Sequence, residues 1–148
     1  MKPLRLPPKI KVLEALGALA DGRVRLGDGR AEVVSSEGDR VYEVCVDLER
    51  GLADSTDNGT KFRGYVGYPI IAVLMALGAL PFDREVAEAL RGVPWRKLNE
   101  KYKKYSKVME VVLEEAEKKG VSRERVLSLV DEVMKKLKEL GLKKGCHL

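Results

Sequence analysis

The sequence contains few of the side chains that carry out enzyme chemistry. Its single histidine, His147, lies one residue from the end, and its only cysteines are Cys45 and Cys146. No phosphate-binding glycine loop, dinucleotide-binding motif or nucleophile elbow is present. Because catalysis requires a positioned base, nucleophile or metal, we predict that the chain is not an enzyme. The prediction includes no catalytic residue, no cofactor and no small-molecule substrate.

Long apolar runs are also missing. The longest extends from Tyr68 to Leu80 and is interrupted by Pro69 and Gly78, and it is shorter than the roughly 20 residues that a membrane helix needs. The N-terminal residues Met1–Arg5 do not begin an apolar signal segment. We therefore expect a cytoplasmic protein without a membrane partner.

The scarcity of cysteine leaves two alternatives for Cys45 and Cys146. Free thiols are usual in cytosolic proteins, and Cys45 alternates with apolar residues in a predicted strand, where it would be a small buried hydrophobic side chain. However, the many Lys, Arg and Glu residues and the few His and Asn residues are typical of thermophile proteins. Disulfides do occur inside hyperthermophile cells, so a Cys45–Cys146 bridge that attaches the C-terminal tail to a strand stays open.

Charge, by contrast, is abundant and unevenly distributed. Charged residues make up 34% and hydrophobic residues 45% of the 148 residues, as in an ordered globular protein that can bury its own core. Residues 1–94 contain 13 Lys and Arg residues and 14 Asp and Glu residues. Residues 95–148 contain 15 Lys and Arg residues and 9 Asp and Glu residues. The net charge of +5 therefore comes from the C-terminal part, and such asymmetry can indicate a nucleic-acid partner.

Hydrophobic periodicity and turn residues predict an α+β fold. We expect a helix at 9–20, a short strand within 23–30, hairpin strands at 31–36 and 41–47, a short strand at 52–55, a polar loop at 56–67, and helices at 68–80, 84–91, 95–119 and 123–140. The helix at 68–80 is apolar around most of its circumference, so it should be the central core helix. Residues 1–94 would form an α+β core, on which 95–148 pack as a basic helical hairpin in one compact unit.

The segment from Val33 to Leu77 and just beyond contains a hairpin (VVSSEGDRVYEVCVDLERGLADS), a loop (TDNGTKFRGYVG) and an apolar helix (YPIIAVLMALGAL). This order resembles the SWIM zinc finger, in which a hairpin carries a Cys-x-Cys pair and a Cys-x-His pair opens the helix. The resemblance implies a ββα arrangement and a role in DNA binding or protein interaction. The segment DNGTKFRGYVGYPII is also similar to one shared by uncharacterised archaeal proteins.

The positions equivalent to the zinc ligands contain none of the required side chains. They are occupied by Leu52, Asp54, Gly67 and Pro69. Structural zinc needs about four nitrogen or sulfur ligands in a tetrahedral array. We therefore predict a SWIM-like module without a metal, whose stability comes from the apolar helix and the added C-terminal helices.

Basic residues are concentrated in two places, one of which also carries aromatic residues. The loop at 56–67 contains Lys61, Arg63 and Tyr65, and the predicted helix at 95–119 contains Arg96, Lys97, Lys101, Lys103, Lys104 and Lys107. Basic side chains contact phosphates whatever the base sequence, and aromatic rings stack on bases. The alternatives are a solvated helix surface and loop aromatics that fold onto the apolar helix.

The leading hypothesis is a non-enzymatic module that binds DNA or RNA without sequence preference through these nine residues. The alternative is a protein-interaction or oligomerisation module that uses the wide apolar stripes of the last two helices. The sequence does not decide between DNA, RNA and a protein partner or homodimer.

Overall fold

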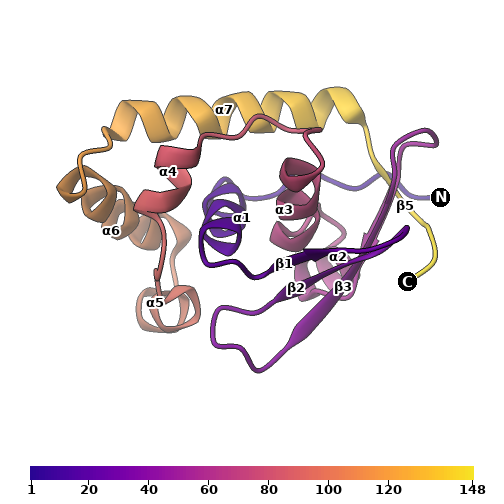
Figure 1. Ribbon diagram of the computed structural model, residues 1–148, viewed down its shortest axis with the longest axis horizontal. Helices are drawn as coiled ribbons and strands as arrows, with labels where there is room; N and C mark the ends of the chain where they lie inside the picture. The colour runs from indigo at the N-terminus through magenta and orange to yellow at the C-terminus, as the bar shows by residue number, and fades with distance from the viewer.

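The computed structural model describes residues 1–148 and confirms the α+β class, with seven helices and one mixed five-stranded sheet. The helices are α1 (Ile10–Ala20), α2 (Asn58–Arg63), α3 (Tyr68–Ala76), α4 (Arg84–Ala89), α5 (Trp95–Tyr102), α6 (Tyr105–Lys118) and α7 (Arg123–Leu140). The strands are β1 (Val24–Leu26), β2 (Ala31–Val34), β3 (Val41–Asp47), β4 (Leu52–Ser55) and β5 (Lys143–Lys144). In the view of Figure 1, α7 runs along one side of the molecule, with α1 and α3 beneath it.

The sheet has the order β1-β2-β3-β4-β5. The first four strands form an antiparallel meander, so the predicted hairpin and the predicted short strands are confirmed. The fifth strand pairs parallel to β4, with Leu52 opposite Lys143 and Ala53 opposite Lys144. This pairing joins residues about 90 positions apart, and no periodicity in a two-residue strand predicts it.

The predicted central helix is confirmed as α3. Ile70, Ile71 and Leu74 are fully buried, and α3 contacts all four strands of the meander as well as α1. One hydrophobic cluster contains these residues together with Val108 of α6 and Val130 of α7. The segments 1–94 and 95–148 thus share a single core.

The last helix has the predicted bounds. Its N-cap Ser122 accepts a hydrogen bond from the N–H of Arg125 at 3.2 Å, and Gly141 ends it in the left-handed conformation. The apolar side of α7, which includes Val126, Val130 and Val133, is buried in the chain's own core. An oligomer would therefore have to form through other surfaces.

The prediction of one helix over 95–119 is wrong. Helix α5 ends at Tyr102, Lys103 has a left-handed φ of 57°, and α6 begins at Tyr105. The two halves bury different neighbours, since Trp95 at the start of α5 contacts Gly17 of α1 whereas α6 packs on α4 and α7. Tertiary packing thus imposes a break at a position where the sequence has neither glycine nor proline.

The prediction of a polar loop over 56–67 is also wrong, because this segment contains α2. Asp57 caps the helix by accepting a hydrogen bond from the N–H of Thr60 at 3.1 Å, and Gly64 ends it with a φ of 69°. Both are ordinary helix-terminating residues. The glycines and polar residues of the segment are as typical of a capped short helix as of a loop.

The two ends of the chain lie on the same side of the molecule, beside β5 (Figure 1). The N–H of Leu4 donates to the carbonyl of Leu142 at 2.8 Å. Cys45 of β3 forms a disulfide with Cys146, with the two Cα atoms 6.2 Å apart, so the structure contains the bridge that the sequence left open. None of the helices is long and apolar enough to cross a membrane.

Candidate nucleic-acid interface

Six basic residues from three segments of the chain gather where its two ends meet. We call them the terminal basic cluster: Lys2, Arg5, Lys61, Arg63, Lys143 and Lys144. Only the two residues of α2, Lys61 and Arg63, were predicted from the sequence as binding residues. The other four were missed because they lie far from α2 in sequence, and only the pairing of the chain ends brings them close.

Hydrogen bonds hold the three segments of the terminal basic cluster together. The N–H of Lys144 donates to the carbonyl of Lys2 at 2.8 Å, and the ammonium of Lys144 donates to the carbonyl of Lys61 at 3.4 Å. The guanidinium of Arg5 donates to the carbonyl of Arg63. Each of these contacts uses a backbone oxygen as the acceptor, so it positions a basic residue without neutralising its charge.

No member of the terminal basic cluster forms an ion pair with a carboxylate. Five are exposed and Lys144 is half-buried. Phe62 lies among them with 73% of its surface exposed, and the ammonium of Lys61 is 5.4 Å from the centre of its ring. The cluster therefore combines uncompensated positive charge with a free aromatic ring.

A buried polar network fixes α2, and with it the position of Phe62. Asp57 is buried and accepts hydrogen bonds from both the N–H and the hydroxyl of Thr60. The hydroxyl oxygen of Thr60 in turn accepts from the N–H of Gly67 at 3.1 Å. A Cβ atom at Gly67 would collide with the carboxylate of Asp57, so this position requires glycine.

Tyr65, the predicted stacking residue, is only 8% exposed. Its ring lies against Gly59, where a Cβ atom would overlap it. Burial raises the pKa of Tyr65, with the Lys11 ammonium opposing this rise and the neighbouring Tyr105 hydroxyl adding to it. Tyr65 thus connects α2 with the start of α6 and does not present its ring to a ligand.

Five lysines surround the break between α5 and α6. We call Lys97, Lys101, Lys103, Lys104 and Lys107 the linker lysines. All five are exposed and none forms an ion pair. The helix break separates them, so they do not form the single helical stripe that was predicted. The Tyr105 hydroxyl at the start of α6 is near enough to Tyr65 to raise the pKa of Tyr65.

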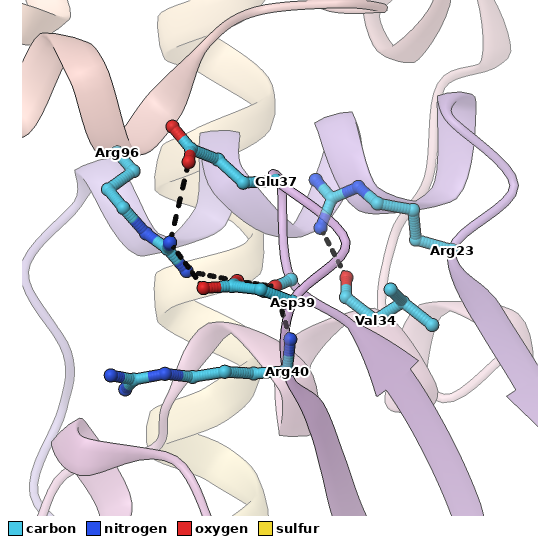
Figure 2. Close-up of polar contacts among 7 residues, drawn as sticks. Arg23, Val34, Glu37, Asp39, Arg40 and Arg96 are labelled. Atoms are coloured by element: carbon cyan, nitrogen blue, oxygen red, sulfur yellow. Dashed lines mark hydrogen bonds and ion pairs between the residues drawn. The ribbon is translucent and has the colours of Figure 1, made fainter.

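Arg96, the remaining predicted residue, is already neutralised within the protein. Its two terminal nitrogens donate to the two carboxylate oxygens of Asp39 at 2.8 and 2.7 Å, and Glu37 lies 3.5 Å away (Figure 2). Hydrogen bonding to Arg96 holds the pKa of Asp39 well below its usual range. Arg96 therefore attaches α5 to the β2–β3 turn and is not free to contact a phosphate.

The four positions equivalent to zinc ligands have structural roles. Leu52 is buried in β4, and the carboxylate of Asp54 accepts a hydrogen bond from the N–H of Ser55 at 2.8 Å. Gly67 precedes α3, and Pro69 occupies its first turn. No group of three or more His, Cys, Asp or Glu side chains is placed to hold a metal ion.

A family model described as "Uncharacterised conserved protein UCP014422" matches residues 4–143. No curated protein and no solved structure matches the chain.

Proposed function

We propose that this chain, which belongs to the conserved family UCP014422, is a non-enzymatic module that binds nucleic acid without sequence preference. The observation that supports the proposal is the terminal basic cluster. It brings together six basic residues without carboxylate partners, and the exposed ring of Phe62 lies beside one of them, Lys61. Such a surface can contact phosphates and stack on a base at the same time.

The physical basis of this binding is the release of counterions from the phosphate backbone. Each phosphate that a lysine or arginine neutralises adds about 0.9 to the negative slope of log K against log salt for duplex DNA, and about 0.7 for single strands. Stacking of one base on an aromatic ring contributes about 1–3 kcal/mol. Because Phe62 needs an unpaired base to stack on, we propose that single strands bind more tightly than duplexes.

The linker lysines would extend the same surface. The Lys11 ammonium is 5.1 Å from the ring centre of Tyr105, and both Lys11 and Tyr105 influence the pKa of Tyr65, which follows α2. A strand that lies on the terminal basic cluster could therefore continue towards Lys103 and Lys104. These lysines would contribute charge without base recognition.

The test is a titration of fluorescently labelled, unrelated DNA and RNA oligonucleotides, single- and double-stranded, followed by anisotropy at several salt concentrations. In the double variant Lys61→Glu with Arg63→Glu, we expect at least a tenfold loss of affinity and a shallower salt slope, by about 1–2 for the two lost phosphate contacts. The variant Phe62→Ala should weaken single-strand binding and leave duplex binding nearly unchanged.

The matched control is Lys135→Glu with Lys138→Glu, two exposed lysines of α7 that give the same change in net charge. Its affinity should stay within about threefold of the wild-type value. If the wild-type protein binds no oligonucleotide at about 50 mM salt, or if the control loses as much affinity as the α2 variant, the proposal is wrong.

The resemblance to the SWIM fold remains part of the proposal. It is supported by the order of a β2–β3 hairpin, β4 and then α3, and by the contacts of α3 with these strands. The alternative function, protein interaction or oligomerisation, remains a prediction. Light scattering on the purified protein tests it, because a strict monomer that captures no partner would exclude it.

A further inference from the structure

A polar cavity lies between α1, the β2–β3 hairpin, the start of α3 and α5, and Arg96 forms part of its wall. Its volume is about 300 Å³, and its wall includes Glu14, Arg23, Tyr42, Tyr68, Trp95 and Asn99. This volume corresponds to roughly ten water molecules at about 30 Å³ each. Small-molecule sites begin at about this size.

Four buried polar atoms on residues of this wall have no hydrogen-bond partner, and one of them, Oε2 of Glu14, forms an ion pair with Lys11 at 2.8 Å. The other three are Nη2 of Arg23, Nε1 of Trp95 and Oδ1 of Asn99. Trp95 is 3% exposed, and the side chain of Arg23 is 10% exposed. Buried polar groups are nearly always satisfied, and each exception requires a reason. Three such atoms on residues around one cavity indicate that a bound polar molecule supplies their hydrogen-bond partners.

The other atoms of these side chains are held in place. Nη1 of Arg23 donates to the carbonyl of Val34 at 2.7 Å (Figure 2), and Nε donates to Asp21 at 3.2 Å. Nδ2 of Asn99 donates to the carboxylate of Glu14 at 3.0 Å. The amide of Asn99 is thereby oriented, and its oxygen remains as an unpartnered acceptor on a residue that lines the same cavity as Arg23 and Trp95.

Aromatic rings form much of the remaining wall. Tyr42 and Tyr68 meet edge to face, with ring centres 6.1 Å apart and an angle of 86°. The indole of Trp95 lies against Gly17, where a Cβ atom would be 2.8 Å from Nε1. Burial raises the pKa of Tyr68 to about 12, so its phenol is neutral at physiological pH. Flat rings around a polar interior suit a flat polar ligand.

The charges around the cavity argue against an anion. Arg23 is paired with Asp21, Arg96 with Asp39 and Glu37, and Lys11 with Glu14 at 2.8 Å. Glu100 also lines the cavity and forms no ion pair. The charged lining residues and their ion-pair partners together make five carboxylates and three cations, and this net negative charge disfavours a phosphate or carboxylate ligand.

We infer that this cavity binds a neutral nucleobase. The edge of a nucleobase carries ring nitrogens and carbonyl oxygens that accept hydrogen bonds beside N–H groups that donate them. It therefore matches the donors Arg23 Nη2 and Trp95 Nε1 and the acceptor Asn99 Oδ1. The base can belong to a free nucleoside or to an unpaired nucleotide of a strand. The inference is independent of the terminal basic cluster, which uses none of these residues.

Trp95 is the only tryptophan in the chain, so its emission reports directly on the cavity. The experiment titrates the protein with adenosine, guanosine, cytidine and uridine, excites at 295 nm, and confirms binding by calorimetry. Inorganic phosphate is the anionic probe, and a single-stranded oligonucleotide is the polymeric one. We expect a saturable change of Trp95 emission with at least one nucleoside and none with phosphate.

The variant Asn99→Ala should weaken nucleoside binding about tenfold, because it removes the one oriented acceptor. The matched control Asn58→Ala alters the same residue type at the start of α2 and should leave nucleoside affinity unchanged. Both variants should keep the salt slope of oligonucleotide binding that the terminal basic cluster provides. Nucleoside binding therefore tests the cavity, and the salt dependence of oligonucleotide binding tests the terminal basic cluster, so one proposal can fail while the other holds.

If only the oligonucleotide changes Trp95 emission, and Asn99→Ala abolishes that change, the inference holds and the base comes from a strand. The inference is overturned if neither nucleosides nor the oligonucleotide give a saturable change. It is also overturned if phosphate binds in their place, or if Asn99→Ala and Asn58→Ala behave alike while circular dichroism shows both to be folded.

Discussion

Arg96 and the terminal basic cluster show two different uses of positive charge in one chain. Arg96 makes a two-point contact with the carboxylate of Asp39 and lies near Glu37, so its charge holds α5 on the β2–β3 turn. The terminal basic cluster has no carboxylate partner, and where its side chains make hydrogen bonds the acceptors are backbone carbonyls. The pairing state of a basic residue, and not its presence in a charge-rich segment, therefore separates the structural role of Arg96 from the binding role that we propose for the cluster.

Other arginines of the C-terminal half are paired with carboxylates, as Arg96 is. Arg123 pairs with Glu110 and Glu117, and Arg125 pairs with Asp83 and Glu85. Arginine suits such contacts because its planar guanidinium binds a carboxylate through two nitrogens. The net charge of residues 95–148 is thus larger than the unpaired positive charge that a nucleic acid would contact. That unpaired charge comes mainly from the lysines.

The largest expected effect concerns the disulfide that holds one end of the terminal basic cluster. The double variant Cys45→Ala with Cys146→Ala should lower the free energy of unfolding by about 4–5 kcal/mol, because the bond closes a loop of roughly 100 residues in the unfolded chain. Urea denaturation with and without dithiothreitol measures this. Oligonucleotide affinity should also fall as β5 loosens.

A reduced wild-type protein should match that double variant, and the variant itself should not respond to dithiothreitol. A wild-type unfolding midpoint that stays the same after complete reduction would contradict the prediction. Loss of stability without loss of oligonucleotide affinity would show that β5 is not needed to form the binding surface.

A smaller effect is expected at the break between α5 and α6, where the linker lysines are found. Lys103 has a left-handed backbone conformation, which costs a non-glycine residue about 1 kcal/mol. Lys103→Gly should therefore raise the free energy of unfolding by up to about 1 kcal/mol while it weakens oligonucleotide binding slightly. Denaturation curves compare it with Lys103→Ala, which removes the charge and keeps the backbone strain.

Equal stability changes in Lys103→Gly and Lys103→Ala would mean that the helix break is not strained. A clear decrease in stability for the glycine variant alone would mean that residues 95–119 form one continuous helix, since glycine is unfavourable inside a helix.

The smallest effect is the pH dependence of the exposed Arg96–Asp39 contact. Since the pKa of Asp39 is lowered below its ordinary 3.8 in the folded chain by hydrogen bonding to Arg96, the contact stabilises the protein above about pH 4. The stabilisation is lost as the pH falls through the lowered pKa. Arg96→Ala should therefore lower the urea midpoint slightly at pH 7, by a difference that shrinks below pH 4.

Lys97→Ala is the neighbouring control, because Lys97 is exposed and unpaired. It should leave the urea midpoint unchanged at every pH and affect only oligonucleotide binding. If Arg96→Ala lowers oligonucleotide affinity more than Lys97→Ala does, the distinction between paired and unpaired charges is wrong.

Local patterns in the sequence predicted most of the elements. The alternation in 31–47 predicted the hairpin, the apolar run after Tyr68 predicted α3, and Ser122 and Gly141 bounded α7. The errors arose where local patterns are ambiguous. Glycines and polar residues in 56–67 were interpreted as a loop, although Asp57 and Gly64 are also the caps of α2.

Seven of the nine predicted binding residues are available to a ligand, and two are not. Lys61, Arg63 and the linker lysines are exposed and unpaired, whereas Tyr65 is buried and Arg96 is paired. Nothing in the residue types distinguishes these cases. The partners of Arg96 lie more than 50 positions away, so no local pattern contains them.

The sequence by itself determined the α+β class, the central apolar helix and the excess of basic residues, because periodicity and composition are local properties. Only the tertiary structure decided which of those basic residues are free, and it brought Lys2, Arg5, Lys143 and Lys144 to α2 through the pairing of the chain ends and the Cys45–Cys146 bond. It also placed three side chains with unpartnered polar atoms, those of Arg23, Trp95 and Asn99, in the wall of one cavity. The physical reason is that charge pairing and burial depend on distances in space between residues far apart in the chain.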